Sequence, residues 1–173
     1  DLVNLWVAGG GCGIAFIQES VSTSFESNSF SVVSRQCATT NLSFAHELGH
    51  NMGARHDRHV DPTNNSPYKY NHGHVNVTDQ WRTIMAYNNK CEEIDETKPC
   101  GRIPFSSNPN KSRDGDPMGI STPSASAADN YRTLKNTAET VARFRTLGKN
   151  EKGDLFGRVV ASGDFNGDGL TDL

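Results

Sequence analysis

The sequence predicts an α+β fold, and three observations support this prediction. Short segments rich in β-branched and aromatic residues stand near the start of the chain. A helical segment with two histidines four residues apart follows them, and residues 126–144 repeat apolar residues at helical spacing. Between the two helices the chain is polar and rich in Pro, Asn and Gly, which indicates long irregular connections.

The expected strands all precede the first helix. They cover residues 1–7, 13–17 and 30–33, which contain apolar and β-forming side chains such as Leu5, Val7, Ile14 and Val32. The glycines at 9–11 indicate a turn between the first two strands, and the Ser-rich stretch at 19–29 indicates a connection to the third.

A metal-binding pattern follows these strands. Residues 46–56 read H-E-x-x-H-x-x-G-x-x-H, with His46, Glu47, His50, Gly53 and His56 at the fixed positions. Residues i and i+4 of a helix share one face, so the first two histidines can hold one ion. Glycine permits a positive φ that ends the helix and brings the third histidine back. Three imidazoles leave one tetrahedral position open, which is typical of catalytic zinc. The alternative is a set of ordinary polar residues on a solvated helix.

The helix that carries this pattern is expected over residues 41–52. Asn41 is a suitable N-cap, because its side chain can accept from a free backbone N–H. The side of this helix expected to face the core consists of Leu42, Ala45, Leu48, Gly49 and Met52.

The extended pattern resembles the metzincin metalloproteases, which carry it together with a later turn that contains methionine. Met85 in the run 81–87 matches that turn, and the resemblance implies that it lies beneath the zinc ligands as an apolar floor. Tyr87 stands where some metzincins have a tyrosine that helps to stabilise the oxyanion. A buried tyrosine with a satisfied hydroxyl is the alternative for Tyr87.

The residue after the third histidine narrows the resemblance. Asp57 is similar to the adamalysin or reprolysin branch, and residues 41–45 resemble the secreted bacterial relatives of that branch. We expect Asp57 to orient its loop by hydrogen bonds to backbone and not to bind metal.

Four cysteines are present, and none has the C-x-x-C spacing of a cysteine zinc site. The resemblance to secreted proteases favours two disulfides, for which three pairings exist. We expect Cys12–Cys37 to join neighbouring strands and Cys91–Cys100 to close a polar loop. Four reduced thiols in a cytosolic protein are the alternative.

The second half of the chain is predominantly irregular. Residues 58–76 are expected to form a long loop, in which His72 and His74 have surface or hydrogen-bonding roles. Residues 107–124 are expected to be a loop as well. A helix over 126–144 would bury a stripe that includes Ala128, Tyr131, Leu134, Ala138 and Val141, with Gly148 after it as a stop.

From residue 149 the composition changes to a linker followed by a loop with oxygen-bearing side chains at alternate positions. The residues at calcium-ligand spacing are Asp164, Asn166, Asp168, Leu170 (through its carbonyl) and Asp172. The flanks read as strands, so the segment resembles an FG-GAP or VCBS repeat of a β-propeller rather than an EF-hand. An acidic turn without metal is the alternative.

Composition excludes several classes of function. The net charge of −3 gives no electrostatic reason to bind nucleic acid or an anionic membrane. No run of about 18 apolar residues exists, so no spanning helix is expected. We expect a monomer that is secreted or lies at the cell surface.

Together these patterns predict a zinc-dependent endopeptidase with protein or peptide substrates. Glu47 would act as general base, and an extended peptide would add to the edge strand at 13–17. The alternatives are a zinc-binding but non-catalytic adhesion module and a calcium-dependent adhesion protein in which the repeat is the working part. We expect a catalytic domain over residues 1–148 that lacks part of its N-terminal subdomain, and a partial repeat over 149–173.

Overall fold

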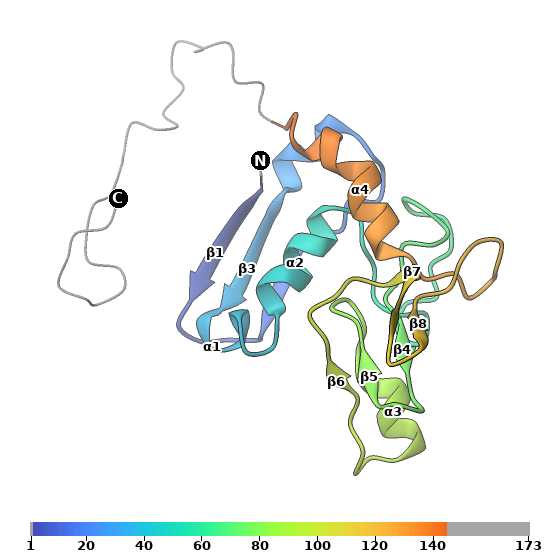
Figure 1. Ribbon diagram of the computed structural model, residues 1–173. Coiled ribbons are helices and arrows are strands. Elements are labelled where there is room, and N and C mark those ends of the chain that lie inside the picture. The colour runs from blue at the N-terminus through green and yellow to red at the C-terminus, as the bar shows by residue number, and fades with distance from the viewer. Residues whose placement is uncertain (1, 145–173) are drawn as a thin grey trace, which may run out of the picture.

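A computed structural model of the chain describes residues 2–144 (Figure 1). It contains small sheets and short helices, so the α+β prediction is confirmed. The first half runs through β1 (Val3–Val7), β2 (Gly13–Ala15), a 3₁₀ helix η1 (Thr23–Asn28), β3 (Phe30–Ser34), α1 (Arg35–Ala38) and α2 (Ser43–Asn51). The second half runs through β4 (Val75–Asn76), β5 (Trp81–Arg82), α3 (Asn89–Ile94), β6 (Gly101–Arg102), β7 (Asn108–Arg113), β8 (Asp116–Met118) and α4 (Asn130–Val141).

The three strands expected from the sequence form one mixed sheet in the order β1–β3–β2. β1 runs parallel to β3, with Val3 opposite Phe30, and β2 runs antiparallel to β3, with Gly13 opposite Val33. The second strand is therefore at an edge of the sheet, as predicted, although it ends at Ala15. Helix α2 lies against β2 and β3 (Figure 1).

Helix α2 differs from its prediction at both its start and its core-facing side. Its N-cap is Leu42, whose φ of 55° is left-handed and whose side chain makes no capping bond, so Asn41 does not cap the helix. Ala45 is exposed, contrary to expectation. The buried positions of α2 are Ser43, His46, Glu47, Gly49, His50 and Asn51. Gly49 is buried as predicted. The other buried positions are polar, and His46, Glu47 and His50 among them carry the metal-binding pattern, so apolar spacing missed them.

Both predicted disulfides are present. Cys12 pairs with Cys37, and Cys91 pairs with Cys100. Cys37 belongs to α1 rather than to a strand, so the first disulfide joins the turn before β2 to the short helix after β3.

The lower part of Figure 1 holds the second sheet, in the order β4–β5–β6, with α3 beside it. The irregular segment predicted at 58–76 leads into this sheet, although its last two residues, Val75 and Asn76, form β4. Small groups of buried apolar side chains lie under it: Val75, Ala86, Cys91 and Cys100 in one, and Trp81, Ile103 and Met118 in the other.

The loop expected at 107–124 contains a hairpin, β7–β8, so that prediction is wrong. Asp114 and Gly115 turn the chain with φ values of 53° and 100°, the conformation of a tight hairpin turn. The strands were missed because β7 is polar and predominantly exposed, and it shows no alternation of apolar side chains.

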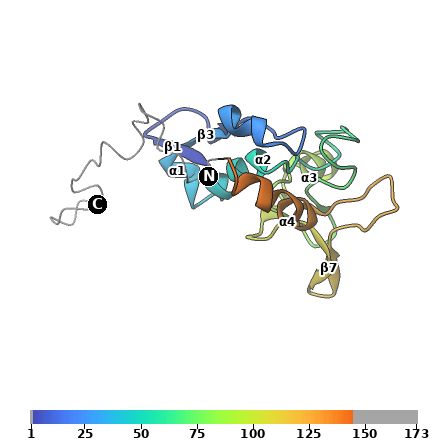
Figure 2. The ribbon, with the colours of Figure 1, turned by 90° about the horizontal axis from the view of Figure 1, so that it is seen from above.

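Helix α4 begins later than expected, and its buried side matches the predicted stripe only in part, at Val141. Asp129 caps it by accepting from the Arg132 N–H. Tyr131 and Ala138 are exposed, whereas Asn130, Thr133, Thr137 and Val141 are buried. The Thr137 hydroxyl donates to the Met52 carbonyl at the end of α2 (2.9 Å), so the helix packs through polar contacts beside α2 (Figure 2). The predicted stop at Gly148 lies outside the described residues.

Candidate metal centre

Three imidazoles meet beside α2. His46 and His50 project from successive turns of that helix, and His56 returns after the turn at Gly53, whose φ is 84°. The His56 Nε2 atom lies 3.0 Å from Nε2 of His50 and 3.2 Å from Nε2 of His46. Within residues 2–144 these three side chains form the one group of His, Cys, Asp or Glu donors that converges in this way.

Hydrogen bonds at Nδ1 fix the tautomers of His46 and His50. His46 Nδ1 lies 2.9 Å from the Ile84 carbonyl oxygen, and His50 Nδ1 lies 2.9 Å from that of Ala54. A carbonyl only accepts, so both Nδ1 atoms carry the proton and both Nε2 lone pairs point toward His56. Nitrogen lone pairs that face one another repel unless a cation lies between them. The donor set therefore fits zinc, which imidazole nitrogens bind tetrahedrally.

Burial keeps these rings neutral. Burial and, to a smaller extent, the neighbouring imidazoles lower the pKa of His46 to about 2 and that of His50 to about 4. Burial also lowers the pKa of His56. Neutral imidazole is the form that binds a metal, so the cluster is in its ligating state at neutral pH.

Glu47 lies beside the histidines with its carboxylate buried against the edge strand. A β-carbon placed on Gly13 would lie 2.7 Å from Glu47 Cγ and 2.8 Å from Cδ, so only glycine allows this approach. Burial raises the pKa of Glu47 to about 7, and the positive charge of Arg102 opposes this rise. A carboxyl group with such a pKa can accept and return a proton near neutral pH.

Met85 is buried beneath the helix that carries the ligands. A β-carbon on Gly49, between His46 and His50, would lie 2.5 Å from Met85 Sδ. The preceding residue, Ile84, supplies the carbonyl that His46 contacts. The methionine therefore packs against the helix between His46 and His50.

Asp57 and Tyr87 connect the two segments around the site. The buried Asp57 carboxylate accepts from the backbone N–H of His59 (3.1 Å) and of Tyr87 (2.8 Å), which matches its expected role. The Tyr87 ring packs 4.2 Å from the His56 ring, centroid to centroid. Burial and the Glu47 charge raise the pKa of the Tyr87 phenol, so it remains protonated at neutral pH. Tyr87 is 39% exposed, so the alternative of a fully buried tyrosine is wrong.

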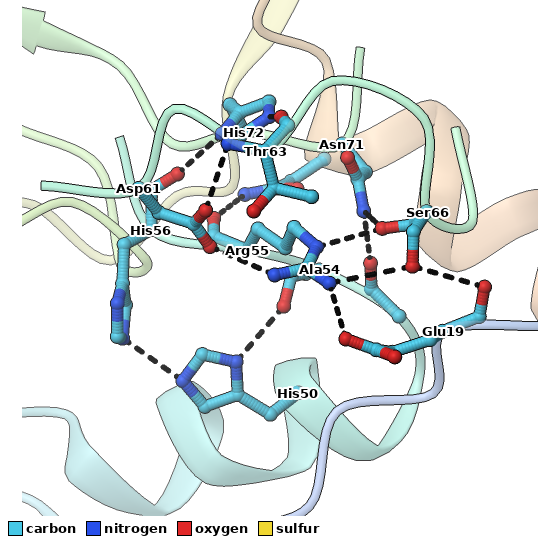
Figure 3. A network of polar contacts seen from close by, with 12 residues as sticks. Glu19, His50, Ala54, Arg55, His56, Asp61, Thr63, Ser66, Asn71 and His72 are labelled. Atoms are coloured by element: carbon cyan, nitrogen blue, oxygen red, sulfur yellow. Dashed lines mark hydrogen bonds and ion pairs between the residues drawn. The ribbon is translucent and has the colours of Figure 1, made fainter. Parts of the chain in front are cut away.

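A second polar network holds the turn after α2 (Figure 3). The Arg55 guanidinium contacts Glu19 Oε1 at 2.7 Å, Asp61 Oδ2 at 3.0 Å and the Ser66 carbonyl at 2.7 Å. The Asn71 amide donates to the Gly53 carbonyl at 2.7 Å. These contacts fix the segment that carries His56.

Comparison with known proteins agrees with this geometry. The sequence matches the family described as metallo-peptidase family M12 over residues 4–97, which is more than half of the chain. The chain belongs to metallopeptidase family M12. Residues 156–173 match the FG-GAP repeat. No solved structure matches the chain.

Several relatives of this M12 chain are named peptidyl-Asp metalloendopeptidase. One from Stenotrophomonas maltophilia is 46% identical over 137 residues, 78% of this chain and 29% of that protein. One from Xanthomonas campestris pv. campestris is 44% identical over 135 residues, 78% of this chain and 28% of that protein. One from Pseudomonas fragi is 44% identical over 110 residues, 63% of this chain and 62% of that protein. The chain thus spans under a third of the length of the first two.

The M12 site also contains residues that the sequence did not single out. Gly13 and Arg102 reach it from distant segments, and Arg55 occupies a variable position of the 46–56 pattern, so no local motif marks them. Conversely, His72 does not join the metal cluster, because its ring nitrogens face the carbonyls of His56 and Thr63. The expected calcium ligands Asp164 to Asp172 lie outside the described residues.

Proposed function

We propose that this M12 protein is a zinc-dependent endopeptidase that hydrolyses peptide bonds in proteins. The observation that carries the proposal is the convergence of three neutral imidazole Nε2 atoms next to the buried Glu47 carboxylate. The names of the relatives support the same reaction class.

In this proposal His46, His50 and His56 hold zinc, which would supply a Lewis acid that acidifies water and polarises a carbonyl group. The Glu47 carboxylate accepts a proton from the attacking water and passes it to the leaving amine. Its pKa of about 7 supports both steps, because neither protonation state is strongly favoured near neutral pH. The protonated Tyr87 phenol donates a hydrogen bond to the carbonyl oxygen as negative charge develops there.

The substrate lies extended along the free edge of β2 and adds to the sheet by main-chain hydrogen bonds. The position of β2 at the sheet edge and the contact of Gly13 with Glu47 support this placement, since they put the edge strand beside the general base. We further propose cleavage next to aspartate, the residue that the names of the relatives specify.

The remaining proposals concern the rest of the protein. A catalytic domain over 1–148 is followed by a partial propeller repeat over 149–173 that binds calcium, for which the FG-GAP match gives support. Secretion is supported by the two disulfides. We also propose a monomer, to be tested by sedimentation. No helix in residues 2–144 has the length and apolar character needed to cross a membrane.

The decisive experiment compares the full-length protein with its Glu47→Gln and His50→Ala variants. We expect about one zinc per chain in the wild type and in Glu47→Gln, and peptidase activity in the wild type alone. His50→Ala should lose zinc as well as activity. Undiminished cleavage by a zinc-loaded Glu47→Gln protein would falsify the general-base assignment, and a zinc-loaded wild type that cleaves no protein would support a non-catalytic module.

A further inference from the structure

We propose that Arg102 is a specificity-determining residue, whose guanidinium binds the side-chain carboxylate of a substrate aspartate that flanks the scissile bond. This inference rests on the proposed function and deepens it, because it names the group in this chain that would recognise the acidic side chain.

The first observation is the position of Arg102. It belongs to β6, and its Nη1 donates to the Asn41 carbonyl just before α2 (2.7 Å). Its Nη2 lies 3.4 Å from the carbonyl oxygen of Ala86, the residue after Met85. The guanidinium thus bridges the start of the ligand helix and the segment beneath it. Ala86 directly precedes Tyr87 in the chain, so the guanidinium lies against the backbone beside one of the proposed catalytic groups.

The second observation is that Arg102 has no counterion. Its Nε is buried without a hydrogen-bond partner, and no carboxylate of residues 2–144 lies within 4.0 Å of the guanidinium. Burial and the positive charge of Arg82 lower the pKa of Arg102 to about 10, although Tyr87 and Glu47 partly oppose this. By contrast, the buried Arg55 pairs with Glu19 and Asp61.

An unpaired, partly buried guanidinium is costly, and a carboxylate that reaches it recovers this cost. Arginine offers a planar fork that binds carboxylate through two hydrogen bonds, and such charge-assisted pairs are among the strongest polar contacts. Arg102 keeps some exposure, so an incoming side chain can reach it. A neutral asparagine of the same shape cannot neutralise the charge. The site should therefore prefer aspartate over asparagine.

The neighbouring Arg82 provides a matched control. It stands opposite Arg102 in the β5–β6 register. Its Nε and Nη1 donate to the carbonyls of Cys100 (2.9 Å) and Ala86 (2.7 Å). Its Nε therefore has a hydrogen-bond partner, whereas the buried Nε of Arg102 has none. Arg82 therefore supports the fold here and does not need a substrate carboxylate.

The test uses the full-length zinc-loaded protein and two peptides, amidated at the C-terminus, that differ by Asp or Asn next to the cleaved bond. We expect the wild type to favour the Asp peptide in kcat/KM, and Arg102→Gln to reduce this ratio about 10- to 100-fold, as expected for loss of a charge-assisted pair. Because both peptides use the same Glu47, a change in its pKa cancels in the ratio. Arg82→Gln should leave the ratio unchanged even if both rates fall.

Binding supplies a second readout that does not depend on turnover. In a Glu47→Gln background, calorimetry should show tighter binding of the Asp peptide, and Arg102→Gln should remove the difference. If Arg102→Gln does not fold, Arg102→Lys keeps the charge without the fork and should still lower the Asp:Asn ratio.

The outcomes separate this inference from the proposed function. A wild type that cleaves neither peptide would contradict the proposed function. A wild type that cleaves while Arg102→Gln keeps the Asp:Asn ratio, or loses both rates equally, overturns the role of Arg102. A preference that follows a free C-terminal carboxylate instead of the Asp side chain, seen by comparing amidated with free peptides, also overturns it.

Discussion

The Glu47 carboxylate lies against the α-carbon of Gly13, so that a side chain on Gly13 would occupy the space of the carboxyl group. This contact joins β2, at the edge of the β1–β3–β2 sheet, to the centre of the site. The edge strand therefore sets the position of the proposed general base, in addition to its proposed role in binding the substrate peptide.

We expect Gly13→Ala to reduce kcat/KM roughly 10- to 100-fold, because a displacement of about 1 Å at a reacting group has an effect of this order. The fold should persist and zinc should stay bound, because the end of the Glu47 side chain can rotate away. Zinc content and peptide cleavage of the full-length protein check this. Gly11→Ala is the control, since a β-carbon there meets nothing within 4 Å. Equal activity in the two variants would contradict the prediction.

The metal-free protein should lose stability on acidification. Unfolded imidazoles titrate near pH 6.5, whereas burial lowers the folded pKa to about 2 for His46 and about 4 for His50. Below pH 6.5 the unfolded state therefore binds protons that the folded state excludes, and the free energy of unfolding decreases as the pH falls. Glu47 acts in the opposite sense between pH 4.5 and about 7, because its pKa is raised, but its shift is smaller than the two histidine shifts together.

The measurement is the urea midpoint of the EDTA-treated protein, followed through the fluorescence of the buried Trp81, from pH 7 down to about pH 4. A midpoint that stays constant or rises on acidification would show that the histidines are not buried as neutral rings.

The contrast between predicted and missed features follows from sequence distance. His46, His50 and His56 could be predicted because helix geometry and one glycine turn bring them together within eleven residues. The hairpin β7–β8 was not predicted because β7 is polar and predominantly exposed. Most of the buried side of α4 was not predicted because it consists of polar side chains, some of which pair with backbone groups of distant segments. The buried Thr137 side chain, for example, donates a hydrogen bond from its hydroxyl to the Met52 carbonyl. Gly13 and Arg102 reach the site through tertiary contacts, and neither carries a local signal.

Calcium binding is predicted for residues 164–172, which lie outside the described part of the chain but within the FG-GAP match. Three carboxylates close in sequence repel one another unless a cation is bound, and carboxylate oxygens suit Ca²⁺. In a calcium titration of the full-length protein, Asp168→Ala should weaken binding and leave the zinc content unchanged. Equal calcium affinity in both proteins would exclude this loop as the site.

The contact of Arg55 with Asp61 should contribute more to the stability of the fold than its contact with the exposed Glu19. The side chain of Asp61 is 13% exposed and that of Glu19 is 68% exposed, although both contact the same guanidinium. Arg55→Met would remove the cation beside the largely buried Asp61 carboxylate, which keeps the Thr63 N–H as a donor, so we expect a loss of about 1.5–3 kcal/mol in the free energy of unfolding. Glu19→Gln removes only the exposed ion pair and should cost about 1 kcal/mol or less. Urea denaturation of the two variants measures the difference. Similar losses would show that Asp61 finds another partner, whereas a large loss for Arg55→Met accompanied by weaker zinc binding would show that the network also holds His56 in place.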